Sequence, residues 1–271
     1  MSSREEGLFL EKGPPFSKNR LNKLGSAWRN GEADKAHEID EFLTFNAVLI
    51  EELMRICNDT IDSIILPMSK SRGAQVAPES SLYNLAGRVK RDESLLEKMR
   101  RMGTTPILNI QDVAGIRLDY DMTLTQQTGL AETFSRAFEF AGAKRVKTID
   151  CRQEPHSGYR AVHLHIYSKA GRAEMQIRTA LQSKWANLYE AATDVYGTDI
   201  KYLHEGAEMP PSAESQVNEL HYLSGLVQQI EALADVNGLQ KNGELIRLQH
   251  KAYGILDRIH TRLKSLRGKM P

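Results

Sequence analysis

Apolar residues recur along the chain at two different spacings, and these spacings predict its secondary structure. Over residues 36–66 they return every three or four positions, which is typical of an amphipathic helix. The same spacing predicts three more helices, over residues 92–102, 124–141 and about 180–193. Apolar, extended runs favour strands over residues 81–90, 112–120 and 144–149. Two prolines, a glycine and several serines indicate a loop over residues 67–80.

Two further segments alternate polar and apolar residues with the period of a strand. The first consists of Val162, His163, Leu164, His165 and Ile166. The second consists of Glu174, Met175, Gln176, Ile177 and Arg178. Because side chains two positions apart share a strand face, carboxylate, amide, guanidinium and imidazole groups line the polar faces. These are groups that bind nucleotides and metal ions, so the two segments predict an active site as well as a sheet.

Five strands interleaved with helices predict an α+β fold, in which a mixed five-stranded sheet is flanked by helices. Pro210 and Pro211 mark a break, beyond which two amphipathic helices are expected over 213–235 and 241–267. The expected regions are a basic N-terminal extension over 1–35, the sheet domain over 36–200 and a C-terminal helical region over 212–271. Since an amphipathic helix must bury its apolar face, we expect the C-terminal helices to serve self-association or a partner.

Composition excludes several classes of protein. The 271 residues carry 36 basic and 35 acidic side chains, so a globally basic nucleic-acid binder is not indicated. Cys57 and Cys151 give neither a disulfide framework nor zinc-ligand spacing, and we expect reduced thiols in a cytoplasmic protein. No apolar run reaches the length of a membrane span. The phosphate-binding loop, the dinucleotide fingerprint and the nucleophile elbow are all absent.

Two carboxylates are the first candidates for chemistry. Asp112 and Glu174 lie in or beside different strands, so a fold can bring them together. Paired carboxylates hold Mg²⁺ while leaving room for phosphate oxygens, and one of them can accept a proton from a hydroxyl. The alternative interpretation is that each is a solvated acid at a strand end. Asp119 and Asp121 form a second, lower-ranked metal pair.

A set of basic residues provides candidates for phosphate binding. The candidates on the ATP side are Arg88, Lys90, Ser94, Lys98, Arg101 and Arg117. A triphosphate needs several cations, and an arginine can also stack on a base. Alternatively, the helix over 92–102 presents a solvated basic face that pairs with its own glutamates. Asp92 or Ser94 is expected to cap this helix, with Ser94 and Glu97 as a capping box.

Tyr159, which follows Gly158 at the mouth of a strand, is a candidate for stacking on a purine. Alternatively, it is a strand-end tyrosine that shields the core. His163 and His165 are candidates for contact with phosphate or ribose, or are simply hydrogen-bonded strand residues.

Taken in order, four segments resemble the synthetase domain of the RelA/SpoT family. Gly87-Arg88-Val89-Lys90, with Ser94 and Lys98 downstream, resembles the family's ATP-binding element. The other three matching segments are Asp112-Val113-Ala114-Gly115-Ile116-Arg117, Gly158-Tyr159-Arg160-Ala161-Val162-His163 and Glu174-Met175-Gln176-Ile177-Arg178-Thr179. Trp185-Ala186 fits the family's downstream Trp-Ala. The resemblance covers about residues 40–195 and is that of a small, single-domain alarmone synthetase.

The resemblance implies an enzyme that moves the β,γ-pyrophosphate of ATP to the 3′-hydroxyl of an acceptor such as GDP or GTP. Asp112 would hold Mg²⁺, and Glu174 would bind that ion or act as base. Arg88 and Arg117 would sandwich the adenine, with Lys90, Lys98 and Arg101 on the phosphates. The acceptor side would consist of Tyr159, His163, Gln176 and Arg178, with the acceptor guanine stacked on Tyr159.

One departure from the family pattern concerns the acceptor. Many members place a lysine shortly before the Gly-Tyr pair, whereas this chain has Arg152 to Ser157 without a lysine. Arg152 or His156 is the expected substitute on the acceptor phosphates. The alternative function is therefore that of a toxic family member, which modifies the 3′ end of tRNA and is neutralised by an antitoxin. A catalytically dead nucleotide-binding regulator is a third hypothesis.

Overall fold

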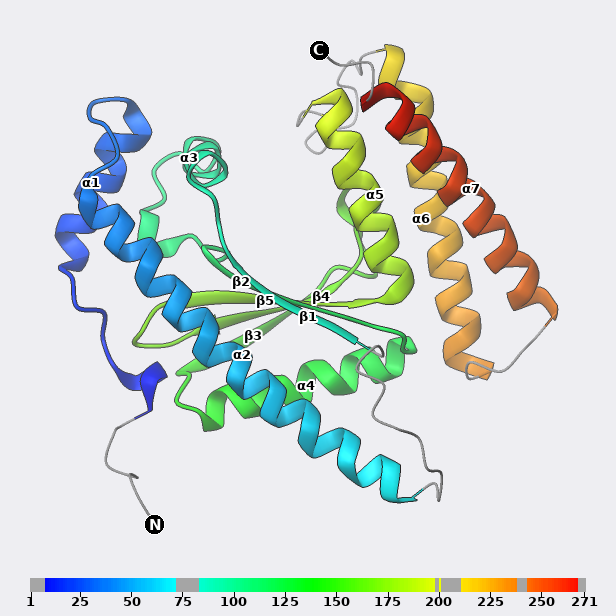
Figure 1. The fold of residues 1–271 in the computed structure, drawn as a ribbon, viewed down its shortest axis with the longest axis horizontal. Coiled ribbons are helices and arrows are strands. Elements are labelled where there is room, and N and C mark those ends of the chain that lie inside the picture. The colour runs from blue at the N-terminus through cyan, green and yellow to red at the C-terminus, as the bar shows by residue number, and fades with distance from the viewer. Residues whose placement is uncertain (1–7, 72–82, 198–199, 201–210, 238–242, 268–271) are drawn as a thin grey trace. The chain divides into compact units, whose positions relative to one another are not determined.

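The computed structural model of the chain describes residues 8–71, 83–197, 200, 211–237 and 243–267 (Figure 1). Side chains are described for these residues except 65–71, 211, 212, 237 and 267. The predicted loop residues 72–80 and the first two residues of the strand predicted over 81–90 lie outside the described residues.

A mixed five-stranded sheet is the centre of the fold, as the sequence predicts. Its strands lie in the order β1-β2-β5-β4-β3. Their bounds are β1 Tyr83–Val89, β2 Ala114–Tyr120, β3 Arg145–Asp150, β4 Val162–Tyr167 and β5 Arg172–Thr179. The two segments with alternating residues are thus neighbours, and β5 is the middle strand. The predicted α+β class, with a mixed sheet and flanking helices, is confirmed.

Helices occupy most of the remaining described chain. The α-helices are α1 Lys18–Asn30, α2 His37–Ser71, α3 Asp92–Arg101, α4 Leu124–Phe140, α5 Ala180–Tyr196, α6 Pro211–Asn237 and α7 Gly243–Arg267. Single 3-10 turns form at η1 Phe9–Glu11, η2 Ile107–Asn109 and η3 His156–Gly158. All of the helices predicted from residue 36 onward are present, with ends that differ by a few residues.

Two of the local predictions are wrong. α2 continues through Pro67 to Ser71, where a loop was expected. A proline inside a helix removes one N–H donor and its ring clashes with the carbonyl four residues earlier, which is why a loop was expected here. α3 begins one residue earlier than a cap at Asp92 requires: Arg91 precedes it without a side-chain cap, and Ser94 lies inside the first turn.

The chain divides into two compact units. One, here called the sheet unit, comprises Met1–Leu118, Leu130–Ile149 and His163–Ile177. The other, here called the helical unit, comprises Asp119–Gly129, Asp150–Val162 and Arg178–Pro271. This division does not follow the predicted region limits, because α5 groups with α6 and α7 and because residues before 36 join the sheet unit.

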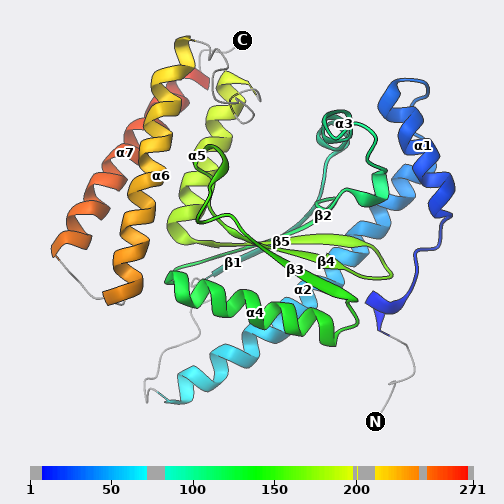
Figure 2. The ribbon, with the colours of Figure 1, turned by 180° about the vertical axis from the view of Figure 1, so that it is seen from behind.

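Within the sheet unit, helices pack on the sheet and also against one another around an apolar cluster. α2 runs along β1, and Figure 2 shows α4 beside the sheet, where Phe134 and Phe138 are fully buried. A Cβ at Gly87 would lie 2.4 Å from the Ile50 side chain of α2, so this glycine permits the close approach of strand and helix. The region that was expected to be a basic N-terminal extension contains helix α1. α1 is capped by Ser17 and buries Leu21 and Trp28 against α2 and α3.

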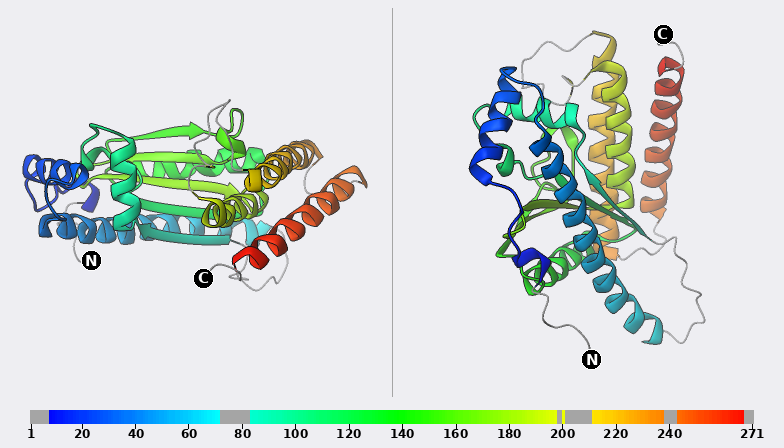
Figure 3. Two further views of the ribbon diagram at one scale, coloured as in Figure 1. Left: turned by 90° about the horizontal axis from the view of Figure 1, so that it is seen from above. Right: turned by 60° about the vertical axis from the view of Figure 1, so that its left-hand side comes forward.

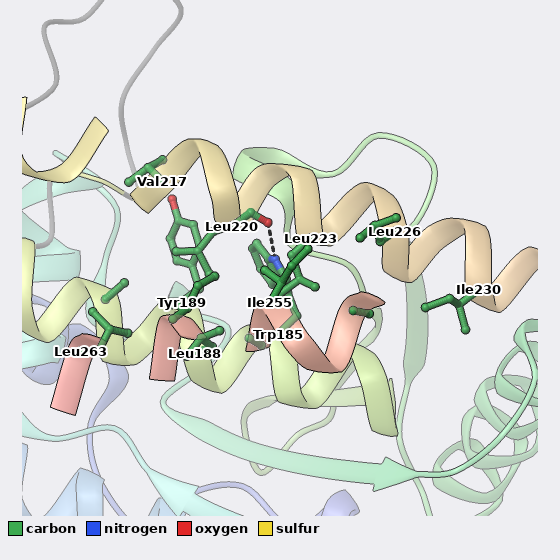
Figure 4. Close-up of a cluster of buried hydrophobic side chains, with 14 of the residues drawn as sticks. Trp185, Leu188, Tyr189, Val217, Leu220, Leu223, Leu226, Ile230, Ile255 and Leu263 are labelled. Carbon is green, nitrogen blue, oxygen red and sulfur yellow. Dashed lines mark hydrogen bonds between the residues drawn. The ribbon is translucent and has the colours of Figure 1, made fainter. Parts of the chain in front are cut away.

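The helical unit is held together by one apolar cluster on α5, α6 and α7, which run side by side (Figure 3). Its members include Trp185, Leu188, Tyr189, Val217, Leu220, Leu223, Leu226, Ile230, Ile255 and Leu263 (Figure 4). The indole Nε1 of Trp185 donates to the Leu220 carbonyl at 2.7 Å. The apolar faces of α6 and α7 are therefore buried within the chain, so this burial no longer requires the external partner that we expected. Among the described helices, none combines the length and the apolar character that a membrane span needs.

We expect Leu223→Ala to lower the free energy of unfolding by about 2–5 kcal/mol, because Leu223 is fully buried and its truncation leaves a cavity. Val236→Ala on the same helix is the matched control: Val236 is 84% exposed and its truncation should change stability by less than about 0.5 kcal/mol. Urea denaturation measures both. Equal effects of the two substitutions would show that the cluster on α5, α6 and α7 does not stabilise the protein.

Candidate active site

The polar faces of the central strands carry most of the predicted site residues. In β2, β4 and β5 the apolar residues are buried and alternate with half-buried polar residues. This alternation places Arg117 between Ile116 and Leu118. The polar residues on β4 and β5 include His163, His165, Glu174 and Gln176, which are half-buried. Burial of the apolar set against the core therefore fixes the direction of the polar set.

Glu174 lies at the centre of a hydrogen-bonded cluster in the sheet unit. Its Oε1 is 3.3 Å from Nδ1 of His163 and 3.2 Å from Nε2 of His165, which both lie on the neighbouring strand. Gln176 donates from Nε2 to Oε2 at 2.9 Å. Burial alone would raise the pKa of Glu174, but the two histidines and Gln176 outweigh it and hold the pKa well below its usual range. The carboxylate is therefore ionised and oriented before any substrate arrives.

Asp112 lies between two lysines. It occupies the turn before β2, where the Lys90 amide donates to the Val113 carbonyl at 2.9 Å and ties the end of β1 to this turn. Nζ of Lys90 is 2.8 Å from Asp112 Oδ2, and Nζ of Lys98, from α3, is 2.7 Å from Oδ1. All three side chains are mostly buried. Burial raises the pKa of Asp112, but Lys98 and Lys90 more than offset this, and the net effect is a lowered pKa.

Of the other residues predicted for ATP, Arg88 and Arg101 are exposed, whereas Ser94 and Arg117 are half-buried. Arg88 lies on β1, next to Gly115 of β2. A Cβ added to Gly115 would be 3.6 Å from the Arg88 carbonyl oxygen, so the two residues are in close contact. Arg101 is exposed at the end of α3, and Ser94 is half-buried in its first turns. Arg88 and Arg117 thus belong to neighbouring strands, as a sandwich around a base requires.

Tyr159 and Arg178 lie together in the helical unit. The guanidinium carbon of Arg178 is 5.1 Å from the centroid of the Tyr159 ring, and its Nη2 donates to the Tyr159 hydroxyl at 3.0 Å. Gly158 has a φ of 84°, and a Cβ there would meet Trp185 at 2.9 Å. The Ser224 hydroxyl donates to the Gly158 carbonyl at 2.6 Å. Helices α5 and α6 therefore brace the Gly-Tyr segment, and Arg178 fixes the ring.

Of the two expected substitutes for the missing lysine, Arg152 is fully engaged in the structure. It pairs with Asp150 at 2.6 Å and also donates to the Leu124 carbonyl, Gln127 and Thr128. Its side chain is 13% exposed. Arg152 must break these bonds before it can offer its donors to an acceptor phosphate, and its role on the acceptor stays a prediction. His156 is exposed, and its Nδ1 lies 3.1 Å from the Ser157 hydroxyl.

One buried acid was not singled out from the sequence. Glu231 of α6 accepts hydrogen bonds from the Thr179 hydroxyl and from Nε2 of Gln182, the latter at 3.0 Å. Thr179 and Gln182 form the capping box of α5. Burial raises the pKa of Glu231. Because Thr179 ends β5, Glu231 supports the end of this strand, and nothing in the sequence of the helix over 213–235 marks it for this role.

The predicted site residues fall into both compact units. Asp112, Glu174 and the residues predicted for ATP belong to the sheet unit, together with His163 and Gln176. Tyr159, Arg178, Arg152 and His156 belong to the helical unit. Among the described residues, Glu174 forms a group of three possible metal ligands with His163 and His165, and Asp112 is not part of it. Ligation of one ion by both Asp112 and Glu174 therefore stays a prediction.

The lowered pKa of Asp112 predicts a specific loss of stability in acid. The folded state binds fewer protons at this group than the unfolded state, so its contribution is present at neutral pH and is lost as the pH falls below about 4–5. In Asp112→Asn, the fall of the unfolding free energy between about pH 5 and pH 2 should be smaller than in the unsubstituted protein. Asp62→Asn, at an exposed position of α2, should leave that fall unchanged. An equally steep fall in Asp112→Asn would contradict the pairing with Lys90 and Lys98.

Comparison with known proteins matches part of the chain to a protein family. Residues 87–200 match the family described as a region found in RelA / SpoT proteins. Uncharacterized proteins of Mycobacterium tuberculosis and Mycobacterium bovis are each 37% identical over 195 residues, which are 71% of this chain and 64% of theirs. The chain thus spans slightly less than two thirds of the length of these relatives.

Solved structures share the fold. Small alarmone synthetase 1 from Bacillus subtilis, bound to its product pppGpp, matches with a TM-score of 0.52 at 20% identity, over 76% of this chain and 100% of that one. A GTP pyrophosphokinase family protein from Streptococcus pneumoniae matches with a TM-score of 0.50 at 21% identity, over 73% of this chain and 93% of that one. The matched family region contains all four of the predicted motif segments. Residues 87–200 therefore correspond to the region found in RelA / SpoT proteins, and the chain shares the fold of these two solved structures.

Proposed function

We propose that this chain is a pyrophosphokinase that transfers the β,γ-pyrophosphate of ATP to the 3′-hydroxyl of a guanine nucleotide, GDP or GTP. In this reaction the 3′ oxygen forms a bond to the β-phosphorus, the bond from that phosphorus to the α,β-bridging oxygen breaks, and AMP leaves. The observation that carries the proposal is the placement of Lys90 and Lys98 on the ionised Asp112, within the matched family region.

Asp112, Lys90 and Lys98 suit a magnesium triphosphate. Mg²⁺ prefers oxygen ligands and is commonly held by one or two carboxylates together with substrate phosphates. The ionised Asp112 meets that requirement, and bound Mg²⁺ would neutralise charge on the phosphates. When ATP binds, Lys90 and Lys98 would contact its phosphate oxygens in place of the carboxylate, and Asp112 would then be available to hold Mg²⁺. Arg101 adds charge on the phosphates, Ser94 contributes a hydroxyl, and Arg88 and Arg117 hold the adenine.

Glu174 suits the acceptor hydroxyl better than it suits Mg²⁺. Its two imidazole neighbours supply nitrogen, whereas magnesium sites are built from oxygen. The lowered pKa keeps Glu174 ionised but makes it a weak base. We therefore assign Glu174 the orientation of the 3′-hydroxyl and acceptance of its proton late in the transfer, since positioning supplies most of the catalysis in phosphoryl-type reactions.

Tyr159 and Arg178 suit an acceptor base. Arg178 fixes the tyrosine ring through a cation–π contact and hydrogen bonds, so little ordering is left for the moment of binding. A guanine stacks on this ring, and His163 completes the acceptor side. Gln176 donates to Glu174 and orients it, and its expected contact with the acceptor stays a prediction.

The second candidate function is pyrophosphorylation of the 3′ end of tRNA by a toxic enzyme with a neutralising antitoxin. The engagement of Arg152 favours it. In the described segment 150–158, this leaves His156 as the one basic side chain without such an ion pair, whereas a free GDP or GTP needs cations for its 5′-phosphates. A tRNA 3′ end makes no such demand.

The decisive experiment incubates the protein and Mg²⁺ with ATP labelled in its terminal phosphate and with GDP, GTP or bulk tRNA as acceptor. Label in a guanosine nucleotide supports the first function, and label in tRNA supports the second. Bound ATP with no transfer to any of the three acceptors would overturn both and leave a catalytically dead nucleotide-binding module.

Glu174→Gln should lower the transfer rate by about a hundredfold or more, because the neutral amide can no longer accept the proton of the hydroxyl. The replacement has nearly the same shape, so circular dichroism should show an intact fold. Glu97→Gln, at an exposed position of α3, is the matched control and should retain full activity. Comparable turnover in Glu174→Gln would remove Glu174 from the mechanism.

Tyr159→Ala should raise the KM for the acceptor by roughly 5–150-fold, the range that corresponds to about 1–3 kcal/mol of stacking, and should leave the KM for ATP nearly unchanged. Tyr159→Phe keeps the aromatic ring, so it should raise the KM for the acceptor much less than Tyr159→Ala does. Steady-state kinetics with each substrate varied in turn makes the comparison. Equal losses for acceptor and ATP would refute the stacking role.

A further inference from the structure

Three side chains on neighbouring strands of the sheet unit form a group that no step of the proposed reaction requires as a unit. His163 and His165 of β4 and Glu174 of β5 each offer one nitrogen or oxygen atom, and these atoms all lie within 4.8 Å of one another. The motif that carries the family resemblance ends at His163. It therefore assigns no role to His165, which shares the polar face of β4 with His163.

The spacing of these atoms fits a bound metal ion. Oε1 of Glu174 lies 3.3 Å from Nδ1 of His163 and 3.2 Å from Nε2 of His165. Around an ion with bonds of about 2.0–2.2 Å, neighbouring ligand atoms are roughly 3–3.5 Å apart. Both histidine–carboxylate separations already fall in this range, so an ion requires only small side-chain shifts.

The donor set selects the class of ion. Two imidazole nitrogens and one carboxylate oxygen suit Zn²⁺ and the other first-row transition metals, whereas Mg²⁺ and Ca²⁺ are held by oxygen. Gln176 donates to the other carboxylate oxygen, Oε2, at 2.9 Å, as residues around metal sites do when they orient a ligand. All three ligand side chains are mostly buried, with exposures of 12% to 24%, so the site restrains its ligands while leaving an approach for the ion.

We propose that His163, His165 and Glu174 bind a first-row transition-metal ion of the Zn²⁺ class, and that the bound ion inhibits pyrophosphate transfer. Inhibition follows because the ion occupies the Glu174 oxygen that would otherwise receive the 3′-hydroxyl. The binding site stands on geometry alone, whereas its inhibitory effect rests on the proposed function. The alternative explanation of the same distances is that the three side chains are hydrogen-bonded to one another and bind no ion.

The test is a calorimetric titration of the metal-free full chain with ZnCl₂, without nucleotide. We expect one ion to bind with a Kd in the micromolar range or below, and His165→Gln to weaken this binding by about tenfold or more. His37→Gln is the matched control, because His37 lies in the sheet unit but is exposed on α2, and it should bind Zn²⁺ as the unsubstituted protein does.

Unchanged Zn²⁺ affinity in His165→Gln, or no binding in the unsubstituted protein, would overturn the site. If circular dichroism shows that His165→Gln does not fold, the Zn²⁺ affinity of Glu174→Gln decides the question by the same criterion.

The inhibitory effect is measured separately, as Mg²⁺-supported transfer with and without Zn²⁺ in the unsubstituted protein and in His165→Gln. Zn²⁺ should inhibit the first at concentrations about tenfold lower than the second. Full transfer by the Zn²⁺-saturated protein would overturn inhibition. If no transfer occurs even without Zn²⁺, the proposed function and the inhibition that rests on it both fail, while the titration still decides whether the metal site exists.

Discussion

The alternation of side chains along β5 is the constraint on which the rest of the site depends. Ala173, Met175 and Ile177 are buried, so the residues between them must face the other side of the sheet. β5 is also the middle strand of five, with β2 on one side and β4 on the other. A polar residue on this strand therefore has partners on both neighbours, and Glu174 meets two histidines of β4 in this way.

Both carboxylates of the site are ionised because each is paired within the sheet unit. Asp112 has two lysines, and Glu174 has two histidines and an amide. The two sets of partners differ in how they respond when a phosphate or a metal ion binds. Lysines release a carboxylate readily to a phosphate, since both partners are simple charges, so Asp112 is poised for exchange. Imidazoles can remain with a carboxylate around a metal ion, so the proposed role of Glu174 at the acceptor hydroxyl is compatible with the proposed inhibition by a bound ion.

The sequence predicts the sheet well because strand alternation and helix periodicity are both set by burial, which also dominates the fold. Its failures have local causes. Pro67 did not end α2, and α3 needs no side-chain cap because α1 and α2 hold it in place through Leu95 and Met99. Periodicity showed that α6 and α7 have an apolar face. It could not show that α5 packs against that face, because this contact depends on the tertiary structure.

The candidate site was predictable as a set of residues and less so as a set of contacts. The motif segments placed Asp112, Glu174, Lys90 and Lys98 together in one region, but not the pairing of Asp112 with both lysines. Arg152 looked available in the sequence because its partners at Leu124, Gln127 and Thr128 are distant along the chain. Glu231 was missed for the same reason, since its partners lie about fifty positions away.

The most direct measurement is a crystal structure of the protein with Mg²⁺ and an ATP analogue whose terminal phosphates cannot be transferred. Our account predicts that Nζ of Lys90 and of Lys98 will contact phosphate oxygens. It also predicts that Asp112 will contact Mg²⁺ and no longer the two lysines. A structure in which the triphosphate binds elsewhere, while Asp112 keeps both lysines, would contradict the central claim.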